Sequence, residues 1–251
     1  MDDACTILRL GDAPWQGAAA RAWLHRLPAA CAAASGAAVL HDGRNRIVRL
    51  AGPAGCAVAV KRFPLRPWQR RLEPLRPHKA VRAFDQATWL LAHGLGTPAP
   101  YAVIATPAHR YLVTACADGC RQAWALHDTA LPGRATLLAA LGGFLARLHD
   151  AGALHRDLTP GNVLIDAADG FLLVDINRLR RTEVDAARGA AELVQLGLAD
   201  ADPLADAYAA ARGLDRLALR QRLRALAWWH RARWWLKDGT RPLRRRLAGR
   251  A

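Results

Sequence analysis

One short stretch of the sequence places oxygen-bearing side chains at a spacing that suits a metal ion. In residues 148–180, LHDAGALHRDLTPGNVLIDAADGFLLVDINRLR, Asp157 and Asn162 are five residues apart and Asp175 follows thirteen residues after Asn162. The runs VLID and FLLVD flank the turn AADG and predict a hairpin, which would bring Asn162 and Asp175 to one end of a sheet. Carboxylate and amide oxygens suit Mg²⁺ bound together with a substrate's phosphates. We therefore predict that Asn162 and Asp175 bind Mg²⁺ and that Asp157 lies near the metal.

A lysine upstream is the next residue of interest. Lys61 ends the second of two strand-like runs in RIVRLAGPAGCAVAVKRF, and the Gly-Pro-Ala-Gly between them predicts a hairpin. Lysine is rare in this chain, because Lys61, Lys79 and Lys237 are the only lysines among 36 basic residues. A lysine kept in so arginine-rich a chain hints that arginine would not serve at that position.

Each of these residues has an ordinary structural explanation when it is taken singly. Asp157 could cap a turn, Asn162 could occupy that turn, and Asp175 could end a strand. The combination of these residues at this spacing, with a lysine-ended strand upstream, favours a functional site over three separate structural roles.

The surrounding pattern predicts a mixed protein in two parts. The first 40 residues favour helix, strands are expected around Lys61 and in YAVIATPAHRYLVTAC with a turn at Pro107, and HKAVRAFDQATWLLAHGLG has the spacing of an amphipathic helix ended by glycine. Beyond residue 116 the pattern is mostly helical, notably in RATLLAALGGFLARLHDAG. We therefore predict a strand-rich N-terminal lobe over residues 1–116 and a helical C-terminal lobe over residues 117–251.

The motifs around Lys61 and Asp157 resemble those of the protein-kinase-like superfamily. HRDLTPGN is similar to the catalytic loop, VDIN occupies the place of D-F-G, and AVAVK is similar to the V-A-I-K strand. The resemblance implies an α+β, two-lobed protein-kinase-like fold, with ATP and Mg²⁺ as cofactors. It implies that Asp157 orients and deprotonates the acceptor hydroxyl, that Asn162 and Asp175 bind Mg²⁺, and that Lys61 binds the α- and β-phosphates.

Three features depart from the superfamily pattern. The glycine-rich loop is absent, and LHDGRNRIVRL stands in its place. The helix after Lys61 has Asp85 where the superfamily has a glutamate, so we predict that Asp85 pairs with Lys61, the alternative being a solvated helix face. After Asp175 there is no A-P-E and little room for a segment on which a peptide substrate could lie.

Within the superfamily, GRN, KAVRAFDQATWLLAHGLGTPAP and VDINRLR are similar to the bacterial lipopolysaccharide kinases that phosphorylate Kdo or heptose of the inner core. This resemblance covers roughly residues 38–215. It implies a glycolipid acceptor, the lipopolysaccharide core, and it implies that Gly43, Arg44 and Asn45 line the nucleotide's phosphates, although Arg44 could equally be a surface arginine.

Two alternatives to a lipopolysaccharide kinase stay open. A Ser/Thr protein kinase is one, since His155 and Arg156 agree with the protein-kinase form. A pseudokinase that acts as a binding module at the membrane is the other, since the glycine-rich loop is missing and aspartate replaces glutamate at residue 85.

The charge of the chain favours an anionic partner, because the formal net charge is +15. Residues 220–250 contain eleven basic residues, one acid and four of the nine tryptophans: Trp228, Trp229, Trp234 and Trp235. Tryptophan beside arginine is favoured at membrane interfaces, so this tail predicts contact with an anionic inner-membrane surface. The alternative is a terminal helix that packs its tryptophans on the C-terminal lobe. We expect no nucleic-acid partner, because paired tryptophan doublets are not a known nucleic-acid-binding module.

The sequence also predicts a cytoplasmic location, with a peripheral contact to the inner membrane. No run reaches about 18 apolar residues, and MDDACTILRL has no long apolar region. The five cysteines are scattered and lack the spacing of metal ligands, which is typical of a reducing compartment.

Overall fold

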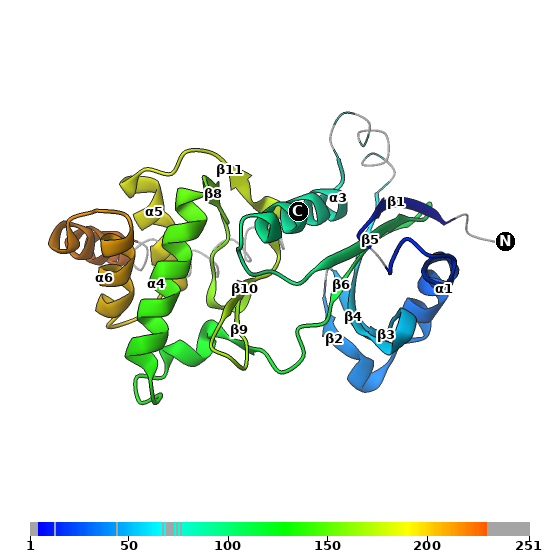
Figure 1. The fold of residues 1–251 in the computed structure, drawn as a ribbon, viewed down its shortest axis with the longest axis horizontal. Coiled ribbons are helices and arrows are strands. Elements are labelled where there is room, and N and C mark those ends of the chain that lie inside the picture. Colours follow the sequence, from blue (N-terminus) through cyan, green and yellow to red (C-terminus); the bar gives the residue numbers. More distant parts are fainter. Residues whose placement is uncertain are drawn as a thin grey trace, which may run out of the picture. The chain divides into compact units, whose positions relative to one another are not determined.

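The structure is a computed structural model that describes residues 5–12, 14–43, 45–66, 68, 73, 75 and 77–229. It divides into two compact units, one made of residues 1–121 and 164–179, the other of residues 122–163 and 180–251. Helices accompany an antiparallel sheet, which confirms the predicted α+β class (Figure 1).

The first unit contains a six-stranded antiparallel sheet in the order β1-β5-β6-β4-β3-β2. Its strands are β1 (Thr6–Leu10), β2 (Val39–Asp42), β3 (Arg46–Ala51), β4 (Ala57–Pro64), β5 (Pro100–Ala105) and β6 (His109–Ala115). The β3–β4 and β5–β6 hairpins are those that the sequence predicts. Successive side chains of a strand point to opposite faces of the sheet, so each strand contributes side chains to both faces.

Helix α1 (Ala18–Ala33) covers one face of the sheet (Figure 1). Leu24 and Leu27 of this helix are buried in one cluster with Val58 and Val60 of β4. Each such side chain contributes about 1.5–3 kcal/mol to stability through burial. The prediction of helix over the first 40 residues is wrong for Thr6–Leu10, which pairs with β5 as an edge strand.

Helix α3 (Lys79–Ala92) lies on the opposite face of the sheet (Figure 1). Its buried residues recur at helical spacing, as the sequence predicts: Ala80, Val81, Ala83, Phe84, Ala87 and Leu90. His78 caps the helix by accepting a hydrogen bond from the backbone N–H of Ala80 at 3.1 Å. Burial lowers the pKa of His78 to about 4, so the ring is neutral at pH 7 and its nitrogen can accept this bond.

Residues 164–179 belong to the first unit, which corrects the predicted division at residue 116. They contain most of β9 (Val163–Ile165), β10 (Phe171–Leu173) and the 3₁₀ helix η5 (Ile176–Arg178), and β7 (Arg121–Gln122) completes a three-stranded sheet in the order β10-β9-β7. Thr97 donates to the carbonyl of Leu173 at 2.8 Å, and the backbone N–H of Leu173 donates to Gly96 at 2.9 Å. A Cβ at Gly96 would lie 2.1 Å from the carbonyl oxygen of Phe171, so only glycine permits this approach.

The second unit is mainly helical. Its elements are the 3₁₀ helix η3 (Ala123–His127), α4 (Arg134–Asp150), β8 (Ala153–Leu154), η4 (Pro160–Asn162), β11 (Arg180–Arg181), α5 (Ala186–Leu193), η6 (Val194–Leu196) and α6 (Asp202–Ala211), followed by helical residues 216–229. Helices α4 and α6 pack closely at Gly142, where a Cβ would lie 2.3 Å from the carbonyl oxygen of Leu204. Strands β8 and β11 pair beside the segment that carries Asp157.

Candidate functional site

Lys61 and Asp175 are in direct contact within the first unit. The Nζ atom of Lys61 lies 2.5 Å from Oδ1 of Asp175, and the two residues are 114 positions apart in the chain. Lys61 points from β4 to the sheet face opposite Val58 and Val60, because residues of even and odd number alternate along the strand. The structure therefore brings together two residues that the sequence assigned to phosphate and metal binding.

The turn after β10 fixes the position of the Asp175 carboxylate. Asp175 has a φ of +55°, in the left-handed region that residues other than glycine seldom adopt. The side-chain amide of Asn177 donates to Oδ1 of Asp175 at 2.7 Å. Strained backbone of this kind is concentrated at functional sites.

Asp85 does not pair with Lys61, which corrects the prediction for this residue. Its carboxylate binds Arg9 of β1, with Oδ1 2.9 Å from Nε of the arginine. Both side chains are a little under half exposed, so this is a surface ion pair. Asp85 lies one position away from the buried stripe of α3, and its side chain therefore reaches β1 at the edge of the sheet.

The β2–β3 turn contains Gly43, Arg44 and Asn45, the predicted phosphate loop. Arg44 lies outside the described residues. The side-chain oxygen of Asn45 accepts a hydrogen bond from Nζ of Lys79 at 3.1 Å. Gly43 is exposed, and a Cβ on it would lie 2.6 Å from Nε2 of His41.

Lys79 is a residue of this region to which the sequence gave no role. Its Nζ lies 4.6 Å from the centre of the Phe63 ring, and Nζ of Lys61 lies 5.4 Å from the centre of the same ring. Two of the three lysines of the chain thus converge on one aromatic side chain. The rarity of lysine in this chain was the sequence signal that could have identified Lys79.

Asp157 and Asn162 form a turn in the second unit. The side-chain amide of Asn162 donates to the backbone carbonyl of Asp157 at 2.8 Å, and the backbone N–H of Asn162 donates to Thr159 at 2.9 Å. An amide ligates a metal through its oxygen, and this hydrogen bond of the Asn162 nitrogen fixes the orientation of the amide. Arg156, which precedes Asp157 in HRDLTPGN, has a φ of +66° and is, like Asp175, a strained backbone position.

Glu192 of α5 anchors this turn and was not predicted. Its carboxylate is 3% exposed and accepts hydrogen bonds from the backbone N–H groups of His155 and Arg156, at 3.0 and 2.6 Å, and from the ring of His149 at 3.1 Å. Burial alone would raise the pKa of Glu192, but these hydrogen bonds outweigh burial and lower it. Gln195 adds an acceptor for the backbone N–H of Leu158 at 3.1 Å.

The donor groups suit Mg²⁺, which prefers oxygen ligands together with water and phosphate. Asp175 offers a carboxylate in the first unit, and Asn162 offers an amide oxygen in the second. Among the residues that the structure describes, no three His, Cys, Asp or Glu side chains lie close enough together to hold a metal ion.

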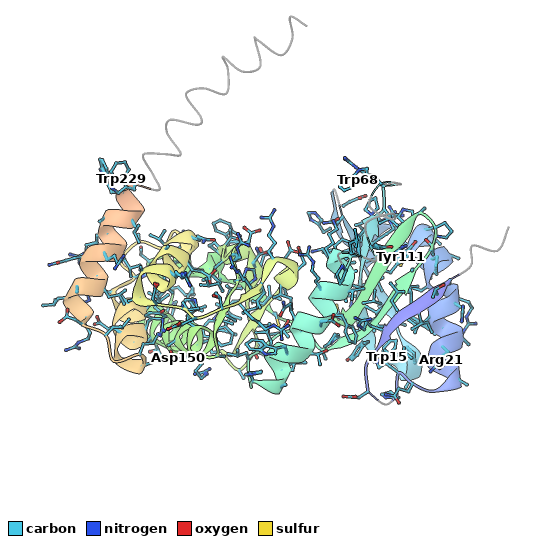
Figure 2. The ribbon with its side chains drawn as sticks, turned by 90° about the horizontal axis from the view of Figure 1, so that it is seen from above. Trp15, Arg21, Trp68, Tyr111, Asp150 and Trp229 are labelled. Carbon is cyan, nitrogen blue, oxygen red and sulfur yellow. The ribbon has the colours of Figure 1, made fainter. Side chains whose placement is uncertain are left out.

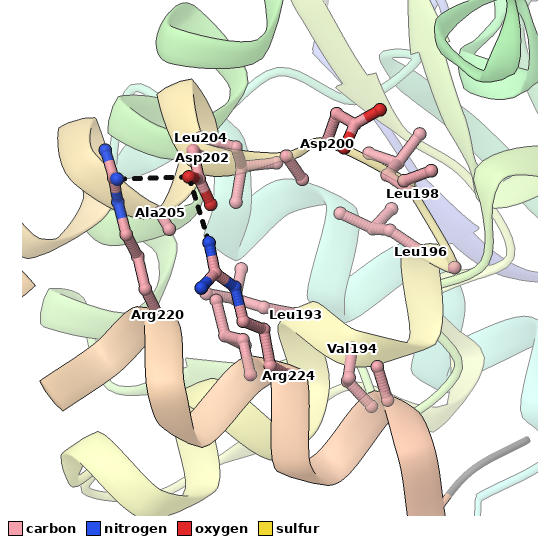
Figure 3. A pocket seen from close by; sticks show the side chains of 15 residues that line it. Leu193, Val194, Leu196, Leu198, Asp200, Asp202, Leu204, Ala205, Arg220 and Arg224 are labelled. Carbon is pink, nitrogen blue, oxygen red and sulfur yellow. Dashed lines mark hydrogen bonds and ion pairs between the residues drawn. The ribbon is translucent and has the colours of Figure 1, made fainter. Parts of the chain in front are cut away.

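A cavity of about 470 Å³ lies in the second unit, between η6, α6 and helical residues 216–229 (Figure 3). Leu193, Leu196, Leu198 and Leu204 line it. At its rim Asp202 pairs with Arg220 at 3.0 Å and with Arg224 at 3.3 Å (Figure 3). The residues that line this cavity include none of the predicted site residues.

The predicted membrane tail is described only at its start. Trp228 and Trp229 are about 60% exposed, and Trp229 lies at the end of helical residues 216–229 (Figure 2). Trp234 and Trp235 lie outside the described residues. Among the residues that the structure describes, no helix is both long enough and apolar enough to cross a bilayer.

Comparison with known proteins gives no family for this chain. No protein-family model matches the sequence, and no curated protein matches it significantly.

Proposed function

We propose that the protein is an ATP- and Mg²⁺-dependent kinase that transfers the γ-phosphate to a sugar hydroxyl of the lipopolysaccharide inner core. The observation that best supports this proposal is the contact between Lys61 and Asp175. Kinase chemistry needs a lysine for the nucleotide's phosphates close to a carboxylate that binds the metal. In this chain the two meet across 114 residues of sequence.

In the proposed reaction, the oxygen of the acceptor hydroxyl attacks the γ-phosphorus of ATP. The bond between that phosphorus and the bridging β–γ oxygen breaks, ADP leaves, and Asp157 accepts the proton of the hydroxyl. Lys61 neutralises charge on the α- and β-phosphates, and Lys79 adds a second positive charge beside the β2–β3 turn. Asn162 and Asp175 are the residues that would hold Mg²⁺, and the ion would supply further neutralisation of phosphate charge.

The short connection after Asp175 supports a sugar acceptor over a protein. Only residues 176–185 separate Asp175 from α5, and they include η5 and the two-residue strand β11. A peptide substrate of a protein kinase needs a longer segment to lie on. The proposed enzyme works in the cytoplasm, with its basic tail on the inner membrane, where a lipid-anchored glycan would be within reach.

A binding module without turnover is the second candidate, and one observation favours it. Asp85 pairs with Arg9, so α3 does not supply the carboxylate partner that active kinases give their lysine. Tight ATP binding without phosphate transfer would support this alternative.

The test is transfer of labelled phosphate from Mg·ATP to dephosphorylated lipopolysaccharide core, beside a generic protein substrate. We expect label on the glycolipid, and loss of that label in Asp157→Ala. Asp169→Asn, which changes an exposed carboxylate in the β9–β10 turn, is a matched control that should retain activity. Label on the protein substrate alone would favour a protein kinase. ATP binding with no transfer to any acceptor would favour the binding module.

A further inference from the structure

An exposed tryptophan, Trp124, lies against the turn that carries Asp157 and Asn162. Its side chain belongs to the second unit, as do both turn residues, and it is 54% exposed. The indole Nε1 approaches Gly161 so closely that a Cβ on this glycine would lie only 3.3 Å away. Gly161 immediately precedes Asn162, so the indole lies beside the proposed metal ligand of its own unit.

The short helix η3 holds this indole in place. Ala123 and Leu126 are buried, and they anchor the helix on the side away from Trp124. Arg134 donates to the carbonyl of Leu126 at 2.8 Å. The ring of His127 packs 5.1 Å from the indole and contacts the carbonyl of Leu196 at 3.2 Å. The tryptophan is therefore positioned before any ligand arrives, which lowers the entropy cost of binding.

The surroundings of the ring suit a ligand with one apolar face and polar edges. Gln122 is exposed beside it and reaches the carbonyl of Gly161 at 3.5 Å. A pyranose has this character, because its C–H groups form an apolar face and its hydroxyl groups surround that face. A large rigid aromatic with a few polar neighbours is a common way to bind such a ligand.

We propose that Trp124 is the platform on which the acceptor's sugar ring stacks, beside Gly161 of the turn that carries Asp157 and Asn162. This inference rests on the proposed function, because it identifies the residue that binds the sugar acceptor of the kinase. The ribose of ATP also carries a sugar ring, so the experiment must separate acceptor binding from nucleotide binding.

The test uses the full chain and a lipid-free, dephosphorylated core oligosaccharide, so that the membrane tail plays no part. Oligosaccharide affinity is measured by calorimetry, and the KM values for ATP and for the oligosaccharide are measured in the transfer assay. We expect Trp124→Ala to weaken oligosaccharide binding and to raise its KM by about tenfold or more, with the KM for ATP unchanged. Trp124→Phe keeps an aromatic face and should recover most of the affinity. Trp68→Ala removes a tryptophan that is as exposed as Trp124 and should change neither KM.

Three results would overturn this assignment. The first is that the wild-type protein does not bind the oligosaccharide. The second is that a folded Trp124→Ala variant binds the oligosaccharide with unchanged affinity. The third is that Trp124→Ala raises the KM for ATP instead of the KM for the oligosaccharide. Should Trp124→Ala fail to fold, Trp124→Phe and Trp124→Leu give the same comparison of an aromatic with an aliphatic side chain.

Failure of the proposed function has a different signature. Oligosaccharide binding that depends on Trp124, without phosphate transfer to any acceptor, would keep the sugar platform and reject the kinase. Phosphate transfer that is indifferent to Trp124 would keep the kinase and reject the platform.

Discussion

At the scale of single residues, the proposed reaction separates two kinds of role. In that proposal Asp157 accepts the proton of the acceptor hydroxyl, whereas Lys61 and Asp175 neutralise or bind the charge of the nucleotide and its metal. The second pair is in contact at 2.5 Å in the structure. If the proposed reaction is correct, ATP phosphates would compete with Asp175 for Lys61.

Substitutions should separate these roles. Asp157→Ala should lower turnover by about 10²- to 10⁴-fold, the usual effect of losing a positioned base, and leave ATP affinity nearly unchanged. Lys61→Ala and Asp175→Ala should instead weaken nucleotide or metal binding. Transfer kinetics together with calorimetric titration of Mg·ATP measure both effects. Equal losses of ATP affinity in all three variants would contradict the division.

The sequence predicted some residues of this site and missed others for physical reasons. Lys61 and Asp175 follow recognisable strand patterns, and the structure brings them together. The partner of Asp85 was mispredicted, because a rotation of one residue around a helix decides whether a side chain meets the next strand or the sheet edge. Glu192 acts through contacts with residues 36 and 37 positions away, which no local pattern reveals.

At the scale of elements, the hydrogen bonds of Glu192 link α5 to the turn that carries Asp157. Glu192→Gln keeps the shape but removes the charge, so the free energy of unfolding at pH 7 should fall by about 1–3 kcal/mol. Chemical denaturation measures this difference. Glu183→Gln, which alters an exposed glutamate, is the matched control and should stay within about 0.5 kcal/mol of the wild type.

The cost of Glu192→Gln should also depend on pH. The folded protein lowers the pKa of Glu192 below its ordinary value of 4.5. The stabilisation by the charged carboxylate is therefore complete above about pH 4.5, and it is lost as the pH falls through the folded pKa. The difference between the wild type and Glu192→Gln should shrink across that range. A difference that stays constant down to the acid limit would contradict this account.

The α4–α6 interface offers a second prediction, from two adjacent glycines. A Cβ at Gly142 would lie 2.3 Å from the carbonyl oxygen of Leu204, whereas a Cβ at Gly143 would meet nothing within 4 Å. Gly142→Ala should destabilise the protein by about 1–3 kcal/mol through overpacking. Gly143→Ala should stabilise it by up to about 1 kcal/mol, because alanine favours helix. Thermal unfolding of the two variants measures whether stability falls in Gly142→Ala and rises in Gly143→Ala. A Gly142→Ala variant as stable as the wild type would contradict the close packing.

Elements with a strong local period were predictable, and those defined by distant partners were not. Helices α3 and α4 and the β3–β4 hairpin follow from the spacing of apolar residues and glycine. Strand β1 has only five residues at a sheet edge, and its pairing with β5 spans almost 100 positions. The assignment of residues 164–179 to the first unit depends on contacts at Gly96 and Thr97, which the residue pattern does not encode.

At the scale of the whole molecule, charge is the feature with the clearest consequence. Residues 228–251 contain eight basic residues and one acid, so they account for seven of the fifteen net positive charges. Deleting them should lower co-sedimentation with anionic vesicles and change binding to neutral vesicles little, because basic residues bind anionic headgroups. Unchanged sedimentation with anionic vesicles would reject the membrane role of this tail.

The division of the chain also limits how the molecule can be dissected. The chain passes from one unit to the other three times, after residues 121, 163 and 179. A fragment that ends at residue 121 lacks the strand that pairs with Gly96 and Thr97, and a fragment that begins at residue 122 carries that strand without its partners. Neither unit is a contiguous segment of the gene, so truncation at one boundary yields two incomplete folding units. Isolating the first unit would require a linker that joins residue 121 directly to residue 164.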